Sequence, residues 1–141
     1  MPVRTIIVAA VASLSFTGTG FGQGTAVFTN SGQALGNNHS ASIALGDLDG
    51  DGDLDAVVAN VPIFDPNMPP PGAPSPNTVW TNDGNGTFTN SGQALGNSYS
   101  SSVALGDLDG DGDLDAMVAN DGYLGAPNTI WTNDGNGAFT D

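Results

Sequence analysis

The stretch DLDGDGDLD runs from Asp47 to Asp55 and recurs unchanged from Asp107 to Asp115. Each copy places five carboxylates within nine residues, so a compact loop would hold like charges a few ångströms apart. Two unit charges about 4 Å apart repel by roughly 4 kcal/mol at an effective dielectric constant of 20. A bound cation relieves this repulsion, and the two glycines of each copy allow the backbone to curl around it. The stretch therefore predicts a cation-binding loop that occurs twice.

The alternating aspartates predict which atoms would surround the ion. Side-chain oxygens are expected from loop positions 1, 3, 5 and 9, and a main-chain carbonyl from position 7, whose carboxylate would point outward. Calcium fits this all-oxygen set, because magnesium prefers strict octahedral geometry and softer metals prefer His or Cys. The predicted cofactor is Ca²⁺ at two sites. The predicted metal-ligating residues are Asp47, Asp49, Asp51, Asp53 and Asp55 in the first copy and Asp107, Asp109, Asp111, Asp113 and Asp115 in the second.

Two alternative interpretations of the loop fit its sequence less well. An EF-hand or dockerin-type loop requires a carboxylate at position 12 and flanking helices, whereas Val58 and Val118 occupy that position and the flanks are β-branched. A solvated acidic loop without a specific ion is the second alternative, and the identical spacing in two places argues against it. We expect a calcium ion here to stabilise the fold rather than to contact a ligand.

The acidic loops belong to a longer internal repeat. Residues 28–60 differ from residues 88–120 at five of 33 positions, and residues 77–89 differ from residues 128–140 at two of 13. The offset drops from 60 to 51 between these two matches, so the nine missing residues lie in one connector, as expected of a surface loop. Seven of the nine prolines lie in the longer connector, residues 62–76, which predicts a stiff, extended loop. A tolerated insertion is favoured there over a recognition loop.

Short strands separated by glycine-rich turns are predicted within each repeat. Apolar residues alternate with polar ones or form brief β-branched runs, and glycine recurs too often for helices. The segment Asn82–Gly86, repeated at Asn133–Gly137, carries the Asp-Gly and Asn-Gly pairs typical of a hairpin turn. A further strand, Thr25–Ser31, precedes the repeats. The repeat strands are predicted at residues 41–46, 56–61, 77–82 and 87–91, and at 101–106, 116–120, 128–133 and 137–140.

The strings LGDLDGDGDLDAVVAN at residues 45–60 and NTVWTNDGNGTFTN at residues 77–90 resemble the FG-GAP or VCBS repeat family, whose units occur in integrin-type β-propellers and in many secreted bacterial proteins. The resemblance covers nearly all of residues 25–141. It implies that each repeat is a four-stranded blade, and that the acidic loop joins the first two strands of the blade and binds calcium.

The predicted fold class is all-β, with two four-stranded antiparallel propeller-type blades plus one leading strand. A blade buries its faces against neighbouring blades, and propellers typically contain four to eight of them. Two blades therefore form a partial β-propeller, which further repeats or several copies of the chain would complete. The predicted domains are a secretory signal peptide at 1–22, a leading strand and linker at 23–40, and blades at 41–92, with the Pro-rich loop 62–76, and at 93–141.

The N-terminal residues predict export from the cytoplasm. Arg4 precedes an apolar run from Ile6 to Leu14 with Phe16, and small residues follow, which is the order of a secretory signal peptide. An apolar run of about 11 residues is shorter than the roughly 20 residues that a membrane-spanning helix needs. The expected location is therefore secreted, extracellular or periplasmic, with no membrane span.

Composition excludes several classes of function. The chain has 141 residues, a formal net charge of −14, one basic side chain (Arg4) and no cysteine. Nucleic acid is not expected as a partner, because no positive surface is present to neutralise phosphate. The chain also lacks thiol nucleophiles and lysine, and its single histidine, His39, is replaced by Tyr99 in the second repeat. No catalytic residue is predicted, and we expect that the protein is not an enzyme.

The predicted function is that of a secreted, calcium-binding and non-catalytic module that acts in adhesion or in carbohydrate or protein binding. The strand positions of Trp80 and Trp131 favour core packing over stacking on a sugar ring. Two alternatives stay open at this point: a domain or fragment of a secreted polysaccharide-active hydrolase or lyase, and a structural extracellular spacer. Expected partners are calcium, a glycan or extracellular protein ligand, and further repeats or copies of the chain.

Overall fold

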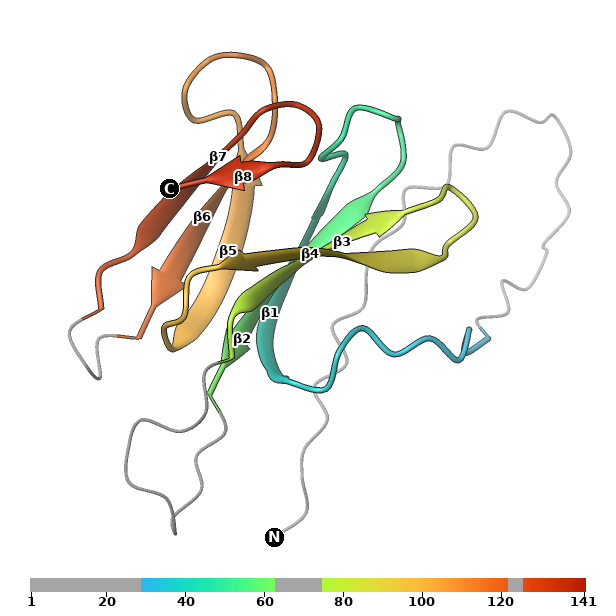
Figure 1. Cartoon of the computed structure of the whole chain (residues 1–141), viewed down its shortest axis with the longest axis horizontal. Helices are drawn as coiled ribbons and strands as arrows, with labels where there is room; N and C mark the ends of the chain where they lie inside the picture. The colour runs from blue at the N-terminus through green and yellow to red at the C-terminus, as the bar shows by residue number, and fades with distance from the viewer. Residues whose placement is uncertain (1–28, 63–74, 122–125) are drawn as a thin grey trace, which may run out of the picture. The chain divides into compact units, whose positions relative to one another are not determined.

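The computed structural model describes residues 29–62, 75–121 and 126–141, which form two four-stranded antiparallel sheets and contain no helix (Figure 1). The strands of each sheet follow one another in chain order, so each sheet corresponds to one sequence repeat. The predicted all-β fold with four strands per repeat is confirmed. The strands are β1 (His39–Gly46), β2 (Asp55–Val61), β3 (Asn77–Asn82) and β4 (Phe88–Leu95) in the first sheet, and β5 (Ser100–Gly106), β6 (Asp115–Asn120), β7 (Thr129–Asn133) and β8 (Phe139–Thr140) in the second.

Strand β4 is longer than its sequence pattern predicts. It pairs with β3 as far as Leu95, but its register shifts between the partners of Thr78 and Trp80. Gly92 lies within the shifted part and has φ +82°, a conformation that glycine adopts readily. The irregularity breaks the alternation of apolar and polar residues, and the predicted strand therefore ended at residue 91.

The turn between β3 and β4 forms as a hairpin, and its aspartate acts through its side chain. The Asp83 carboxylate accepts hydrogen bonds from the amides of Asn85 (2.9 Å) and Thr87 (3.0 Å), and only glycines in this turn have positive φ. Asp134 accepts the corresponding bonds from Asn136 (2.9 Å) and Ala138 (3.2 Å) in the second sheet. The predicted hairpins at both sites are confirmed.

An asparagine pair joins the end of β2 to the start of β3, where the long connector leaves and returns. The Asn60 amide donates to Asn77 Oδ1 (2.8 Å), and the Asn60 side chain donates to the Pro76 carbonyl (2.9 Å). Asn120 makes both bonds in the second sheet, with Asn128 and Pro127. Because these bonds fix both ends of the connector, its length can differ between the repeats without altering the sheet.

The two sheets share one hydrophobic core. Val57 and Val79, which are cross-strand partners in the first sheet, are fully buried. They belong to a cluster that also contains Val103 and Val118 of the second sheet. Burying an aliphatic side chain of this size stabilises a fold by roughly 1.5–3 kcal/mol relative to leaving it exposed. The second sheet therefore supplies much of the apolar cover of the first.

The predicted leading strand is not observed in its described residues. Residues 29–31 have no regular secondary structure, and residues 25–28 lie outside the described residues, as does the predicted signal peptide. Gln33 nevertheless bonds Gly86 and Phe88 (2.6 and 2.8 Å) as Gln93 of β4 bonds Gly137 and Phe139. Gln33 thus makes with the hairpin of the first repeat the same contacts that Gln93 makes with the hairpin of the second, although its segment does not pair as a strand.

Most of the Pro-rich connector, residues 63–74, also lies outside the described residues. Among the residues that the structure describes, no helix is long and apolar enough to cross a membrane.

A glycine permits the close approach of the two sheets. A Cβ atom at Gly46 would lie 2.6 Å from Cδ1 of Leu114 and 3.0 Å from Cδ1 of Leu105, both in the second repeat. At the equivalent glycine of the second repeat, Gly106, the one atom of the described residues within 4 Å of such a Cβ atom is Cδ2 of Leu108, at 3.9 Å. The two positions are therefore alike in sequence and differ in their surroundings.

We expect Gly46→Ala to lower the free energy of unfolding by about 1–3 kcal/mol, because the new methyl group overpacks the contact with Leu114. Gly106→Ala is the matched control and should leave stability unchanged or raise it slightly. Urea denaturation of both variants, at protein concentrations where the chain is monomeric, measures the difference. Equal effects of the two substitutions would contradict the described packing of the sheets.

Candidate metal centre

Each acidic stretch forms the loop between the first two strands of its sheet. We call residues 47–55 the first acidic loop and residues 107–115 the second. Gly50 and Gly52 have φ +78° and +94°, so the backbone turns sharply at both. The amides of these glycines donate to the two carboxylate oxygens of Asp47, at 2.9 and 3.0 Å. The first carboxylate of the loop therefore lies at the inside of the curl.

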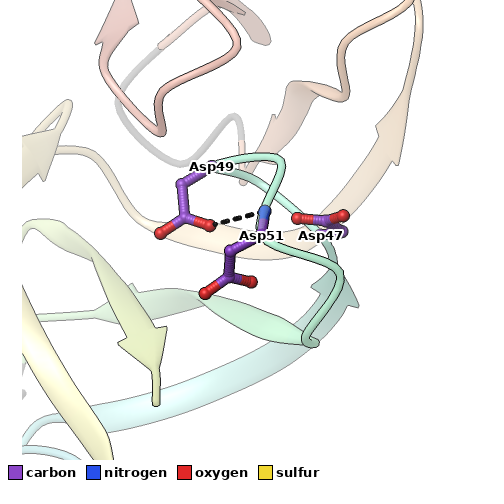
Figure 2. A group of neighbouring side chains, drawn as sticks. All are labelled: Asp47, Asp49 and Asp51. Carbon is purple, nitrogen blue, oxygen red and sulfur yellow. Dashed lines mark hydrogen bonds between the residues drawn. The ribbon is translucent and has the colours of Figure 1, made fainter. Parts of the chain in front are cut away.

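The following aspartates continue this pattern. Asp49 accepts a hydrogen bond from the Asp51 amide (3.3 Å), and Asp51 accepts one from the Asp53 amide (2.9 Å). Figure 2 shows the carboxylates of Asp47, Asp49 and Asp51 along one loop, with the bond between Asp49 and the Asp51 amide dashed. The second acidic loop repeats all four bonds at 2.7–3.2 Å. The sequence thus folds into the same curl twice.

The spacing of the carboxylates suits a calcium ion. One oxygen each of Asp47, Asp49 and Asp51 lie within 4.8 Å of one another, as do oxygens of Asp107, Asp109 and Asp115. Oxygens that bind the same Ca²⁺ at 2.3–2.6 Å can lie no more than about 5 Å apart. The two groups together use loop positions 1, 3, 5 and 9, the four positions predicted to supply side-chain ligands. Both donor sets fit the ion, and its binding stays a prediction.

The groups leave out several of the predicted ligands. Asp55 does not join the cluster of the first loop, and Asp111 does not join that of the second. Asp53 and Asp113, predicted to act through their main-chain carbonyls, are in neither cluster. The Asp53 carboxylate lies against Gly84 of the hairpin turn, where a Cβ atom would collide with it. Glycine at this turn leaves room for the carboxylate.

Asp55 has a structural role that the sequence analysis missed. Its side chain is fully buried and accepts hydrogen bonds from the amides of Leu48 (3.0 Å) and Asn82 (2.8 Å). Asp115 does the same with Leu108 and Asn133, at 2.8 and 2.9 Å. The last carboxylate of each loop therefore joins the loop to the end of the third strand. An aspartate at the first residue of an apolar strand was the available signal.

Burial and mutual repulsion oppose ionisation at the third loop position. Burial raises the pKa of the Asp49 carboxyl above its ordinary value, and the charge of Asp55 raises it further. The pKa of Asp109 is raised as well, first by partial desolvation of its carboxyl and then by the charge of Asp111. The pKa of Asp115 is lowered, mainly by the hydrogen bond from the Asn133 amide. A cation placed among these groups would favour the ionised form of each.

The hairpin of the second repeat covers the first acidic loop. The Asn133 side chain donates to the Leu48 carbonyl (2.8 Å), and a Cβ atom at Gly137 would lie 3.5 Å from the Asp49 Cβ atom. Asp49 is half-buried as a result, whereas its equivalent, Asp109, is exposed. Oδ1 of Asn133 is buried and has no hydrogen-bond partner among the described residues. The bond from Asn133 to Leu48 could not be predicted from the sequence, because the equivalent residue of the first repeat, Asn82, is also an asparagine and nothing local distinguishes the two.

The remaining candidate residues lie away from the acidic loops. Trp80 is 9 % exposed, belongs to a hydrophobic cluster and donates its indole N–H to Thr78 Oγ1 (2.9 Å), which confirms it as a core residue. Trp131 is half-buried and lines an open hollow of about 450 Å³ together with Pro76, Ala94, Gly96 and Asn97. His39 is exposed at the start of β1.

Comparison with known families agrees with the resemblance seen in the sequence. Residues 71–118, about a third of the chain, match the family described as FG-GAP-like repeat. The matched segment runs from the second half of one repeat into the first half of the next and contains the whole second acidic loop. Neither the search of curated proteins nor that of solved structures found a significant match.

We expect Asp55→Asn to lower the free energy of unfolding by about 1–3 kcal/mol in the presence of a chelator. An amide can accept only one of the two buried hydrogen bonds and leaves the other N–H unpaired. Asp51→Asn is the matched control, because Asp51 is exposed and an asparagine oxygen can still accept from the Asp53 amide. Denaturant titrations of both variants test this expectation, and equal stabilities would rule out the structural role of Asp55.

Asp134 should make stability depend on pH. Hydrogen bonds from the amides of Asn136 and Ala138 lower its pKa, so its ionised form stabilises the fold. This contribution is complete above the ordinary aspartate pKa of about 3.9 and is lost as the pH falls through the lower value of the folded state. Denaturant titrations with chelator between pH 5 and pH 2.5 should show a smaller loss of stability for Asp134→Asn than for the unmodified chain. Parallel curves would contradict the assignment.

Proposed function

We propose that this chain, which carries an FG-GAP-like repeat over residues 71–118, is a non-catalytic extracellular binding module whose two repeats each bind one Ca²⁺. The observation that carries the proposal is that the same acidic curl occurs twice and gathers carboxylate oxygens each time, with positions 1 and 3 shared by both groups. Both acidic loops occupy the same position in their sheets, and both bring three carboxylate oxygens within 4.8 Å of one another.

Calcium would act on stability through the residue between the first two ligands. Leu48 lies between Asp47 and Asp49, is 1 % exposed and belongs to the core cluster shared by both sheets. Repulsion among the carboxylates opposes the curl that places Leu48 in this cluster. An ion that neutralises the carboxylates would therefore strengthen the core as well as the loop. The ion would thereby couple loop geometry to the packing of one repeat on the next.

A binding role is supported by what surrounds the loops. The clustered aspartates are the proposed calcium ligands, which leaves them no separate catalytic role. His39 is exposed at the start of β1 and belongs to neither acidic cluster of the described residues. The open hollow at Trp131 offers an aromatic side chain and the polar Asn97 to a glycan or an extracellular protein. Location outside the cell rests on the signal-like order of Arg4 and the apolar run that follows it.

Calcium should raise the thermal stability of the chain and bind with a stoichiometry of two. A ligand at 100 times its dissociation constant stabilises the folded state by about 2.7 kcal/mol per site. Circular dichroism melts in millimolar calcium and in chelator should therefore differ by several degrees, and isothermal titration calorimetry counts the sites. Asp47→Asn/Asp49→Asn and Asp107→Asn/Asp109→Asn should each remove one site.

Asp121→Asn, in an exposed residue outside both acidic loops, is the control and should retain two sites. Magnesium at the same concentration should give a smaller shift, because it does not readily accept this flexible all-protein donor set. A cooperative melt that is identical in calcium and chelator would show that the fold is correct and the calcium assignment is wrong.

A further inference from the structure

The two repeats bury opposite faces at their shared core. Leu48, Val57 and Val79 of the first repeat are each at most 1 % exposed. Their equivalents in the second repeat are Leu108, Met117 and Ile130, which are 47 %, 44 % and 48 % exposed. These three residues form what we call the trailing face. The same positions are thus core in one repeat and surface in the other.

The converse holds for the other side of each sheet. Val103, Leu105 and Leu114 of the second repeat pack in the shared core. Their equivalents in the first repeat are Ile43, Leu45 and Leu54, which are 42 %, 41 % and 50 % exposed. We call these three residues the leading face. The exposed side chains of both faces are therefore the equivalents of side chains that are already buried in the contact between the repeats. On the leading side of the first sheet, the neighbouring Ala56, Val58 and Trp80 are buried in a smaller cluster with Leu35.

The shapes of the two faces also correspond. Gly46 leaves a notch in the first sheet that the side chains of Leu114 and Leu105 fill. Gly106 leaves the same notch in the trailing face, and among the described residues only Leu108 lies within 4 Å of a Cβ atom built there. Leu54 and Leu45 of the leading face are the equivalents of the two leucines that fill the notch at Gly46. The chain carries both the notch and the side chains that fit it.

Polar contacts show the same correspondence. Asn133 donates both to Leu114 O (3.2 Å) in its own repeat and to Leu48 O (2.8 Å) in the first repeat. Asn82 makes the first of these bonds, to Leu54 O (3.2 Å), and in the described part of the chain makes no counterpart of the second. Gly137 packs on the first acidic loop, whereas a Cβ atom at Gly86 would meet nothing within 4 Å among the described residues. The second hairpin therefore contacts an acidic loop of the neighbouring repeat, and the described residues offer no such loop to the first hairpin.

We propose that copies of this chain associate head to tail, with the trailing face of one copy packed on the leading face of the next. The contact repeats the one between the two repeats, with Leu54 and Leu45 at the Gly106 notch and Asn82 donating to the Leu108 carbonyl. The sequence differences between equivalent face residues exchange one apolar side chain for another, so both faces keep their character. The proposal does not depend on calcium binding.

The head-to-tail arrangement has consequences that a symmetric dimer lacks. A heterologous contact leaves one free face at each end of a complex, so assembly continues until a ring closes or a filament forms. Each chain carries a net charge of −14, so repulsion between copies opposes assembly at low ionic strength. Added salt screens this repulsion and leaves the apolar contact intact. Association should therefore strengthen as the salt concentration rises.

Mixing two variants with opposite faces blocked tests the proposal. Met117→Asp/Ile130→Asp blocks the trailing face, and Ile43→Asp/Leu45→Asp blocks the leading face. We expect the unmodified chain to show masses at several multiples of one chain in sedimentation velocity at moderate salt. Each variant alone should sediment as a single chain. Their equimolar mixture should form a complex of two chains and none larger, because one complementary pair of faces remains.

Asn37→Asp/Asn38→Asp is the control for added charge, since both residues are exposed in the segment that precedes β1, and it should assemble like the unmodified chain. Circular dichroism melts identify any variant that fails to fold, and threonine in place of aspartate at the same positions then provides the milder substitution. A single-chain mass for the unmodified protein at all concentrations would overturn the proposal. Self-association of either face variant alone would overturn it too, because it would indicate contact between like faces.

Discussion

The need to bury apolar side chains on both faces of a β-sheet is the constraint on which the rest of the structure depends. Strand β2 shows it directly, because every residue from Ala56 to Ala59 is buried although successive side chains point to opposite faces. One face of the first sheet is covered by the second sheet, and a smaller cluster around Trp80 forms on the other side with help from Leu35. The fold is therefore a stack in which each repeat supplies the cover that its neighbour needs.

The acidic loops are part of this stack, and their carboxylates have two distinct duties. Asp55 and Asp115 accept buried backbone hydrogen bonds and fix where the loop meets the sheet. The aspartates at loop positions 1, 3 and 5 accept hydrogen bonds from amides of the loop, and these bonds hold its curl. Their carboxylates also repel one another, and a cation would relieve this repulsion. Leu48 connects the acidic loop to the shared core, since its backbone bonds Asp55 and Asn133 while its side chain lies in that core. Electrostatics in the loop and packing between the repeats are consequently coupled.

Local sequence signals predicted local structure well, and they could not predict contacts between the repeats. The strands, the hairpin at Asp83 and the acidic curl follow from alternation, turn residues and glycine spacing, all of which act within a few residues. The shift of β4 at Gly92 depends on a partner strand, so it is not readable from one segment alone. The start of an apolar strand at Asp55 hinted at the burial of its side chain, but not at its bond to Asn82. The bond from Asn133 to Leu48 spans 85 residues, and an identical Asn82 lacks it.

Because the two repeats are nearly identical in sequence, a structural difference between equivalent residues reflects their different surroundings rather than their residue type. Gly46 and Gly106 have the same backbone setting in β1 and β5, yet only Gly46 is pressed by leucine side chains. Asp49 and Asp109 make the same loop contact, yet only Asp49 lies beneath a hairpin. Features shared by both copies, such as the curl and the asparagine pairs, must arise within a repeat. Features found in one copy alone arise from its neighbour or from the few positions at which the copies differ. The contacts at Gly46 and Asp49 are of the first kind, because both lie where one repeat packs against the next.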